Sequence, residues 1–247
     1  MLSRRHFGLA MLGAFFVAVY LRVLRPWQLR WGATEDETIR PLPGDEVVPN
    51  PTFNATRAVT IMARPEEIWP WLVQIGLRRA GWYSFDWIDN LGQPSAQRLI
   101  PEFQQLAIGD FIPMSPIGRV GQWVKEFEPN RWLLWWDNRG DVSWLWFLDP
   151  ADERHTRLIT RVRMRYRWAS PTILFNLLLD VGDIVMMRKS LLGIKQRAER
   201  PAESPSVSRR HAPQACPFPA EGSQLAPRLK IASTASAIPS GKGAPRT

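Results

Sequence analysis

The chain has 247 residues, of which 45% are hydrophobic, and its formal net charge is +9. The excess charge lies at the two ends, because residues 1–31 and residues 200–247 each carry a net +5 and the middle is nearly neutral. The sequence therefore predicts no nucleic-acid partner. Cys216 is the only cysteine and the three histidines are far apart, so no disulfide, metal site or cofactor is expected.

Residues 1–31 are predicted to form an N-terminal transmembrane anchor. Phe7 to Leu21 is an apolar run, and it reaches the ~20 residues that a membrane span needs when it is continued to Trp27. Ser3-Arg4-Arg5-His6-Phe7 also resembles a twin-arginine export signal. The residues around Leu21 form a poor cleavage site, which favours an uncleaved single span, residues 7–27, over a removed signal peptide. Arginines flank both ends, so the side of the membrane stays open.

Residues 32–51 are expected to be a semi-extended linker, because four prolines stand among acidic residues. A domain, residues 52–199, then opens with a strand from Phe53 to Met62, which is rich in β-forming residues. Pro65 suits the first position of a helix, and Pro70 limits that helix to about two turns.

The stretch 81–114 is expected to be central to the domain, because it contains a dense group of aromatic residues. Its four aromatic residues within six positions cannot all face one side of a single helix or strand. Some should therefore pack into the core while others line the wall or lid of a pocket. The four are Trp82, Tyr83, Phe85 and Trp87.

Four further runs are predicted to be strands: 120–127, 131–136, 143–148 and 156–168. In the last run four arginines, at 161, 163, 165 and 167, alternate with Val162, Met164, Tyr166 and Trp168, which predicts a buried face and a basic, solvated face. Pro171 should open a helix that breaks at Gly182, with Asp183 capping a second helical segment. Residues 200–247 are expected to be a disordered tail.

Three motifs, in order, resemble the SRPBCC superfamily, which includes START, Bet v 1-like and polyketide cyclase-like proteins. They are the strand end at 60–63 with Arg64-Pro65-Glu66-Glu67-Ile68-Trp69, the run GWYSFDWIDNLG with the later GDFIPM, and residues 187–195. The second and third are similar to an uncharacterised bacterial branch. The resemblance implies an α+β helix-grip fold, in which a curved antiparallel sheet wraps around a long C-terminal helix and a hydrophobic cavity lies between them. With the anchor, it also implies a single-pass protein of the bacterial inner membrane.

The candidate ligand-binding residues are those expected around that cavity. They are Trp82, Tyr83, Phe85, Trp87, Met164, Tyr166, Ile184, Met187 and Leu191. The catalytic residues are unknown; Asp86 and Tyr83 are candidates, although a helix-surface acid and a buried tyrosine bonded to backbone are the plainer interpretations. His155 falls in a predicted turn, where it should be solvated.

The favoured hypothesis is a membrane-tethered module that binds or transfers a hydrophobic small molecule, such as a lipid, quinone or polyketide-like compound. One alternative is a cyclase/aromatase-like or hydrolase-like enzyme in the same cavity, which would need a titrating group inside it, such as Asp86 with a raised pKa. Another is an interaction domain whose tryptophans fill the core, indicated by a cavity smaller than ~300 Å³. The ligand and the oligomeric state stay open.

Overall fold

The computed structural model describes residues 4–114, 120–166 and 173–200, and at residues 4–7, 9–10 and 173–181 it describes the backbone alone. These residues all belong to one compact unit, Met1–Glu203. The predicted tail lies outside the described residues except for Arg200, and so do Arg167, Trp168 and Pro171.

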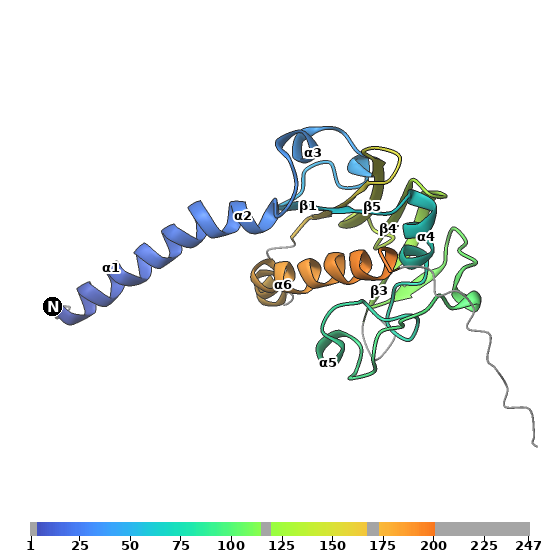
Figure 1. Cartoon of the computed structure of the whole chain (residues 1–247). Coiled ribbons are helices and arrows are strands. Elements are labelled where there is room, and N and C mark those ends of the chain that lie inside the picture. Colours follow the sequence, from blue (N-terminus) through green and yellow to red (C-terminus); the bar gives the residue numbers. More distant parts are fainter. Residues whose placement is uncertain (1–3, 115–119, 167–172, 201–247) are drawn as a thin grey trace, which may run out of the picture. The chain divides into compact units, whose positions relative to one another are not determined.

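Six antiparallel strands form one curved sheet in the order β1-β6-β5-β4-β3-β2 (Figure 1). β1 pairs with β6 along its whole length, from Phe53 opposite Met164 to Ile61 opposite Thr156. A register shift between Val124 and Glu126 interrupts the pairing of β3 with β4. The strands are β1 (Phe53–Ile61), β2 (Phe111–Pro113), β3 (Gly121–Glu128), β4 (Trp132–Trp136), β5 (Val142–Pro150) and β6 (Thr156–Met164). The five predicted strands are present, and the short edge strand β2 is an addition.

The helices include α1 (Arg4–Val19), a π-helical turn η1 (Tyr20–Leu24), α2 (Arg25–Leu29), α3 (Glu35–Ile39), α4 (Pro65–Val73), α5 (Asp86–Asp89) and α6 (Ile173–Ala198). Short 3₁₀ turns lie at η2 (Asp45–Val47) and η3 (Pro101–Phe103). Among the described residues, none of these helices combines the length and the apolar character needed to cross a membrane.

The predicted break at Gly182 is wrong, because α6 continues through it without interruption. A helical glycine costs only about 1 kcal/mol. On the next turns of α6, Met187, Leu191 and Ile194 are buried in the core of the domain. That burial stabilises the helix by more than the glycine costs, since each fully buried side chain contributes roughly 1.5–3 kcal/mol.

The two faces of the sheet have different coverings. The inner face lies against α6, and α3 lies on the other side of the strands (Figure 1). Alternate residues of β4 and β5 point inward, among them Leu133, Trp135 and Trp146, and share one core with α4 and α6. Their neighbours Leu134 and Leu145 point outward into a smaller cluster with Leu42. This α+β arrangement of a curved antiparallel sheet and a C-terminal helix is the one that the sequence resemblance implies.

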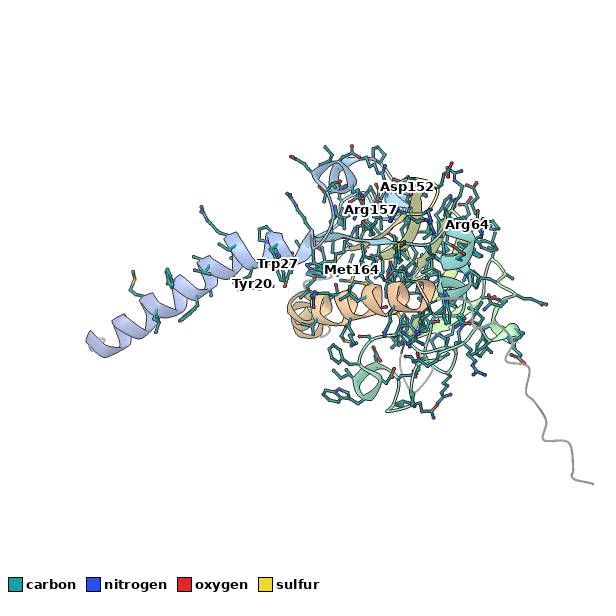
Figure 2. All side chains as sticks on the ribbon, viewed as in Figure 1. Tyr20, Trp27, Arg64, Asp152, Arg157 and Met164 are labelled. Atoms are coloured by element: carbon teal, nitrogen blue, oxygen red, sulfur yellow. The ribbon has the colours of Figure 1, made fainter. Side chains whose placement is uncertain are left out.

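The prediction of a solvated basic face on β6 is wrong. Residues 32–51 pack across the outer face and cover the arginines at 157, 161 and 163. Arg157, which Figure 2 labels on this side of the sheet, binds Glu37 with its Nε and Nη2 at 2.8 and 2.7 Å. Glu37 also completes a capping box with Thr34 at the start of α3. Arg165, as predicted, is exposed, and Arg167 lies outside the described residues.

Asp45 is the second carboxylate that this segment supplies. It binds Arg161 at 2.6 Å and Arg163 at 3.0 Å. Arg161 is 3% exposed and also donates to the carbonyl oxygens of Glu37 and Arg40. A buried guanidinium needs such partners because desolvating an unpaired charge is costly. Residues 32–51 therefore pack on the outer face of the sheet as part of the folded structure.

Candidate functional site

The aromatic stretch splits between the interior and the surface. Trp82 and Tyr83 are buried, Phe85 is half-buried, and Trp87 is 75% exposed. Tyr83 adopts a left-handed backbone conformation, with φ of 57°, shortly after Gly76 and Gly81, which also have positive φ. Residues 82–83 lie in the core, and residues 86–89 form the short surface helix α5 beyond this reversal. The four aromatic residues are therefore split between the core and the surface, as expected, and two of them are interior.

Four tryptophans pack against one another in the core that the sheet shares with α6. Trp82 stacks on Trp144 with ring centroids 5.8 Å apart, and Trp144 stacks on Trp146 at 5.2 Å. Trp135 meets Trp82 and Trp144 edge-on, at 6.3 and 5.3 Å. Stacked and edge-on pairs are the favoured aromatic geometries. These four rings form part of the core on the inner face of the sheet.

Several polar atoms on the inner face have no hydrogen-bond partner among the described residues. The indole nitrogens of Trp135 and Trp146 are buried donors without acceptors, and Gln122 Oε1 is a buried acceptor without a donor. By contrast, the Trp144 indole donates to Thr160 Oγ at 2.8 Å. More than nine in ten buried polar groups in proteins are satisfied, so each exception needs a physical reason.

Arg57 adds a third donor group to this face. It lies in β1 between the inward-facing Ala55 and Val59 and is 1% exposed. Its Nε donates to the Gln28 carbonyl at 2.8 Å and its Nη1 pairs with Asp183 of α6. Its Nη2 is buried and has no partner in the described part of the chain. Sequence reasoning missed Arg57, because a lone arginine in a strand gives no periodic signal.

The Tyr83 side chain is committed to the protein core. Its hydroxyl donates to the Trp71 carbonyl at 3.2 Å and accepts from Gln74 Nε2 at 2.8 Å. Burial raises the pKa of the Tyr83 phenol far above its ordinary value. Tyr83 is therefore a buried tyrosine whose hydroxyl is bonded to the backbone, which is the plainer of its two interpretations from sequence.

The two acids of α5 have different surroundings. Asp86 accepts a short hydrogen bond from Ser95 Oγ. Both oxygens of Asp89 are buried without a hydrogen-bond partner among the described residues. Burial, with the charge of Asp86, raises the pKa of Asp89 to about 6, although the nearby Ser84 hydroxyl opposes the shift. In the structure that hydroxyl is turned to the Met186 carbonyl, at 3.1 Å.

The remaining candidates lie at the end of β6, directly after it, and on α6. Tyr166 stacks on Phe53 with a centroid separation of 6.5 Å, and Ile184 is buried. Met164, labelled in Figure 2, is half-buried at the end of β6. Tyr166, Met187 and Leu191 all belong to the inner core, and Met164 packs against it. The structure thus gathers most of the predicted set in one core with Trp82 and Tyr83, whereas Trp87 is exposed.

Two hollows lie on the described surface. The larger, about 360 Å³, is bordered by Trp123, Lys125 and Trp136 at the β3–β4 edge and contains none of the predicted residues. The smaller, about 250 Å³, lies between α6 and the segment 83–95. Tyr83 and Asp86 border it with Ser84, Ser95, Lys189, Leu192, Gly193, Gln196 and Arg197. We call it the polar hollow.

No family model and no curated protein sequence matches this chain. Solved structures with a similar fold include a polyketide-cyclase-like protein of Corynebacterium glutamicum, which is 16% identical, with 58% of this chain and 89% of that chain covered and a TM-score of 0.38. A protein of Arthrobacter aurescens is 14% identical, with coverage of 71% and 99% and a TM-score of 0.35. CalU16 of Micromonospora echinospora is 13% identical, with coverage of 59% and 84% and a TM-score of 0.29.

Proposed function

We propose that this protein binds a hydrophobic small molecule that carries oxygen acceptors, such as a quinone or polyketide-like compound, on the inner face of the sheet. The observation that carries the proposal is the set of buried donors on that face that have no hydrogen-bond partner in the described part of the chain: Trp135 Nε1, Trp146 Nε1 and Arg57 Nη2. Each unsatisfied donor costs about 1–3 kcal/mol when it is buried. A ligand oxygen that accepts from one of them recovers this free energy.

The charge at Arg57 favours a neutral acceptor over an acid. Arg57 already has a counter-charge in Asp183, so the pair is electrically balanced. A carbonyl or hydroxyl oxygen can accept from Nη2 without disturbing that balance, whereas a carboxylate would compete with Asp183. The aromatic and aliphatic residues around the donors provide the apolar contacts that such a ligand needs.

A matched pair of probes tests the proposal. Dimethylnaphthoquinone and dimethylnaphthalene share a ring system, and the first alone carries oxygen acceptors. The full-length protein is expected to bind the quinone about ten-fold more tightly, which corresponds to one hydrogen bond of about 1.4 kcal/mol. Tryptophan fluorescence quenching measures both affinities, and native mass spectrometry of the detergent-extracted protein checks for a co-purifying ligand.

Substitutions of single tryptophans distinguish a ligand site from a filled core. Trp135→Phe and Trp146→Phe remove the unpartnered N–H groups and are expected to abolish the preference for the quinone. Trp144→Phe is the matched control, because its N–H already donates to Thr160. If neither probe binds, or if the quinone has no advantage in the unsubstituted protein, the tryptophans only fill the core and the proposal fails.

We also propose that residues 7–27 tether the protein to a membrane, with the inner membrane of a bacterium as the expected location. Helical backbone continues from α1 through η1 into α2. Many of the large apolar side chains described along it are at least half exposed, among them Phe15, Phe16 and Trp27 (Figure 2 labels Trp27). A helix that is apolar on all sides is unfavourable in water and stable in lipid.

Membrane fractionation tests the tether. Full-length protein is expected to stay in the membrane pellet after a carbonate wash, and a Phe15→Lys/Phe16→Lys variant to leave it, because a lysine near the centre of a span costs about 2.5–3.5 kcal/mol. Leu91→Lys/Leu99→Lys is the control, since both leucines are exposed outside this segment. Equal retention of both variants, or release of the unsubstituted protein, would show that residues 7–27 are not the tether.

A further inference from the structure

Three buried arginines in the domain have different electrostatic partners. Arg57, Arg161 and Arg197 are 1%, 3% and 7% exposed. Arg57 pairs with Asp183 and Arg161 pairs with Asp45. Among the described residues, no carboxylate forms an ion pair with Arg197. Asp86 is near enough to act on the charge of Arg197 but forms no ion pair with it. Since buried charges in proteins are normally paired directly, Arg197 differs from the other two arginines.

The partners of Arg197 are neutral. Its Nε donates to the Ala96 carbonyl at 2.8 Å and its Nη1 donates to the Gly193 carbonyl at 3.0 Å. Its guanidinium lies 4.3 Å from the centre of the Tyr83 ring. Burial lowers the pKa of Arg197 from its ordinary value, which means that the surroundings disfavour the cation. These contacts hold the side chain in place without supplying a negative charge.

Arg197 borders the polar hollow, and the other groups there are also suited to a polar ligand. Lys189 lies two turns earlier on α6 and is exposed, and Gln196 is exposed beside Arg197. Asp86 is the one acid among the bordering residues, and its Oδ1 is occupied by Ser95. Two cations and one carboxylate border the hollow, and because Asp86 acts on the charge of Arg197, the positive excess that attracts anions comes from Lys189 at the far rim.

The walls of the hollow are fixed by close packing. A Cβ atom on Gly193 would lie 2.2 Å from the Tyr83 carbonyl oxygen, so α6 and the segment 82–84 approach as closely as a glycine permits. Ser190 Oγ donates to the Trp82 carbonyl at 2.7 Å, and the Ser84 hydroxyl donates to Met186 one turn earlier on α6. A site held by such contacts is preorganised, which lowers the entropy lost on binding.

We propose that the polar hollow binds a small anion, a phosphate or carboxylate group, whose oxygen atoms pair with Arg197. The volume of about 250 Å³ is below the roughly 300–1,000 Å³ of pockets for drug-sized ligands, so the occupant is small. Lys189 is about 12 Å along the helix axis from Arg197, given a rise of 1.5 Å per residue. It therefore acts at the far rim and does not share the same anion. This site is separate from the proposed apolar site and does not depend on it.

Titration of the full-length protein with inorganic phosphate and with acetate, at constant ionic strength, tests this site. The expected result is a saturable shift of the backbone amide NMR signals of Tyr83, Ser95 and Gly193 with at least one of the two anions. Constant ionic strength removes general screening as a cause. Direct replacement of Arg197 is a poor test, because it would also release the Ala96 and Gly193 carbonyls.

Gln196→Glu is the diagnostic variant. It places a carboxylate on the rim of the hollow and is expected to weaken anion binding about ten-fold, or about 1.4 kcal/mol. Gln93→Glu is the matched control, because it makes the same change at an exposed position that does not border the hollow, and its affinity should stay within two-fold. Phosphatidylglycerol vesicles form a third arm, which should leave these signals unchanged. The site is refuted if neither anion saturates, if both variants respond alike, or if only vesicles shift the signals.

Discussion

The two faces of the sheet differ in how far their buried polar groups have hydrogen-bond partners. On the outer face, Arg157, Arg161 and Arg163 meet carboxylates and carbonyls from residues 32–51. On the inner face, Trp135, Trp146 and Arg57 keep donors that no described residue accepts. Among the described residues, the three outer arginines have acceptors, although Arg40 Nε on that side has none, and the inner face keeps three donors without acceptors. A ligand that accepts hydrogen bonds from such donors removes the free-energy cost of burying them without partners.

The largest expected effect tests the packing of the inner face. Trp135→Ala should lower the free energy of unfolding by about 3–5 kcal/mol, because it opens a large cavity among three other tryptophans. Urea unfolding followed by circular dichroism measures the change. Trp87→Ala is the control, since its side chain is 75% exposed and should change stability by less than about 0.5 kcal/mol. Similar losses from both substitutions would contradict the assignment of Trp135 to the core.

The next effect tests the outer face. Asp45→Asn should destabilise the protein by about 2–3 kcal/mol, because it removes the negative charge that Arg161 and Arg163 share. Asp36→Asn makes the same chemical change on the same segment, where the carboxylate is 75% exposed and 3.9 Å from Arg40. Exposed pairs of that kind contribute about 0–1 kcal/mol. Equal effects in the same unfolding assay would mean that residues 32–51 do not hold the outer face.

Acid should weaken the outer face through Glu37. Although burial opposes ionisation, the hydrogen bonds and charge of Arg157 hold the pKa of Glu37 below its usual value of 4.5. A lowered carboxyl pKa stabilises the folded state above pH 4.5, and the contribution disappears as the pH falls through the folded-state value. Glu37→Gln should therefore cost on the order of 1 kcal/mol at pH 7 and progressively less below pH 4.5. A difference that does not vary with pH would rule out this linkage.

The smallest effect concerns a carboxylate with no arginine partner. Burial raises the pKa of Asp89 to about 6, above the 3.8 of the unfolded chain, so the ionised form destabilises the folded state. That penalty is complete above pH 6 and is relieved as the pH falls from 6 to 3.8. Asp89→Asn should raise stability by less than about 1 kcal/mol at pH 7, given partial exposure, and by nothing near pH 3.5. Chemical denaturation at both pH values tests the sign, and a loss of stability at pH 7 would refute it.

The strands and the inner core could be predicted because both leave a pattern in the sequence. Alternation in β6 and the density of tryptophan in β4 and β5 identify a sheet with one heavily apolar face. Trp82, in the predicted aromatic stretch, is buried with them. The same density could not show that Trp87 is exposed, because that depends on the reversal at Tyr83. No local pattern specifies that reversal.

The covering of the outer face could not be predicted, because its contacts join residues far apart in the sequence. Arg161 and Glu37 lie 124 positions apart, and an arginine in an alternating strand reads as solvated unless a partner is known. The signal that was present is the spacing of Thr34 and Glu37, which matches a capping box and predicts a short helix inside the supposed linker. The buried Arg57 and Arg197 have no such signal.

The pairing of β1 with β6 has a consequence for how the chain folds. The two strands are separated by about a hundred residues, so their ladder closes a long loop, and contacts of this kind form slowly. The strands β3 to β6 are joined by short turns and can assemble as neighbouring hairpins first. During synthesis β1 emerges before β6, so the edge of β1 that pairs with β6 stays unpaired until β6 has been made. The tryptophan-rich hairpins are then exposed until α6, the last described element to emerge, covers them.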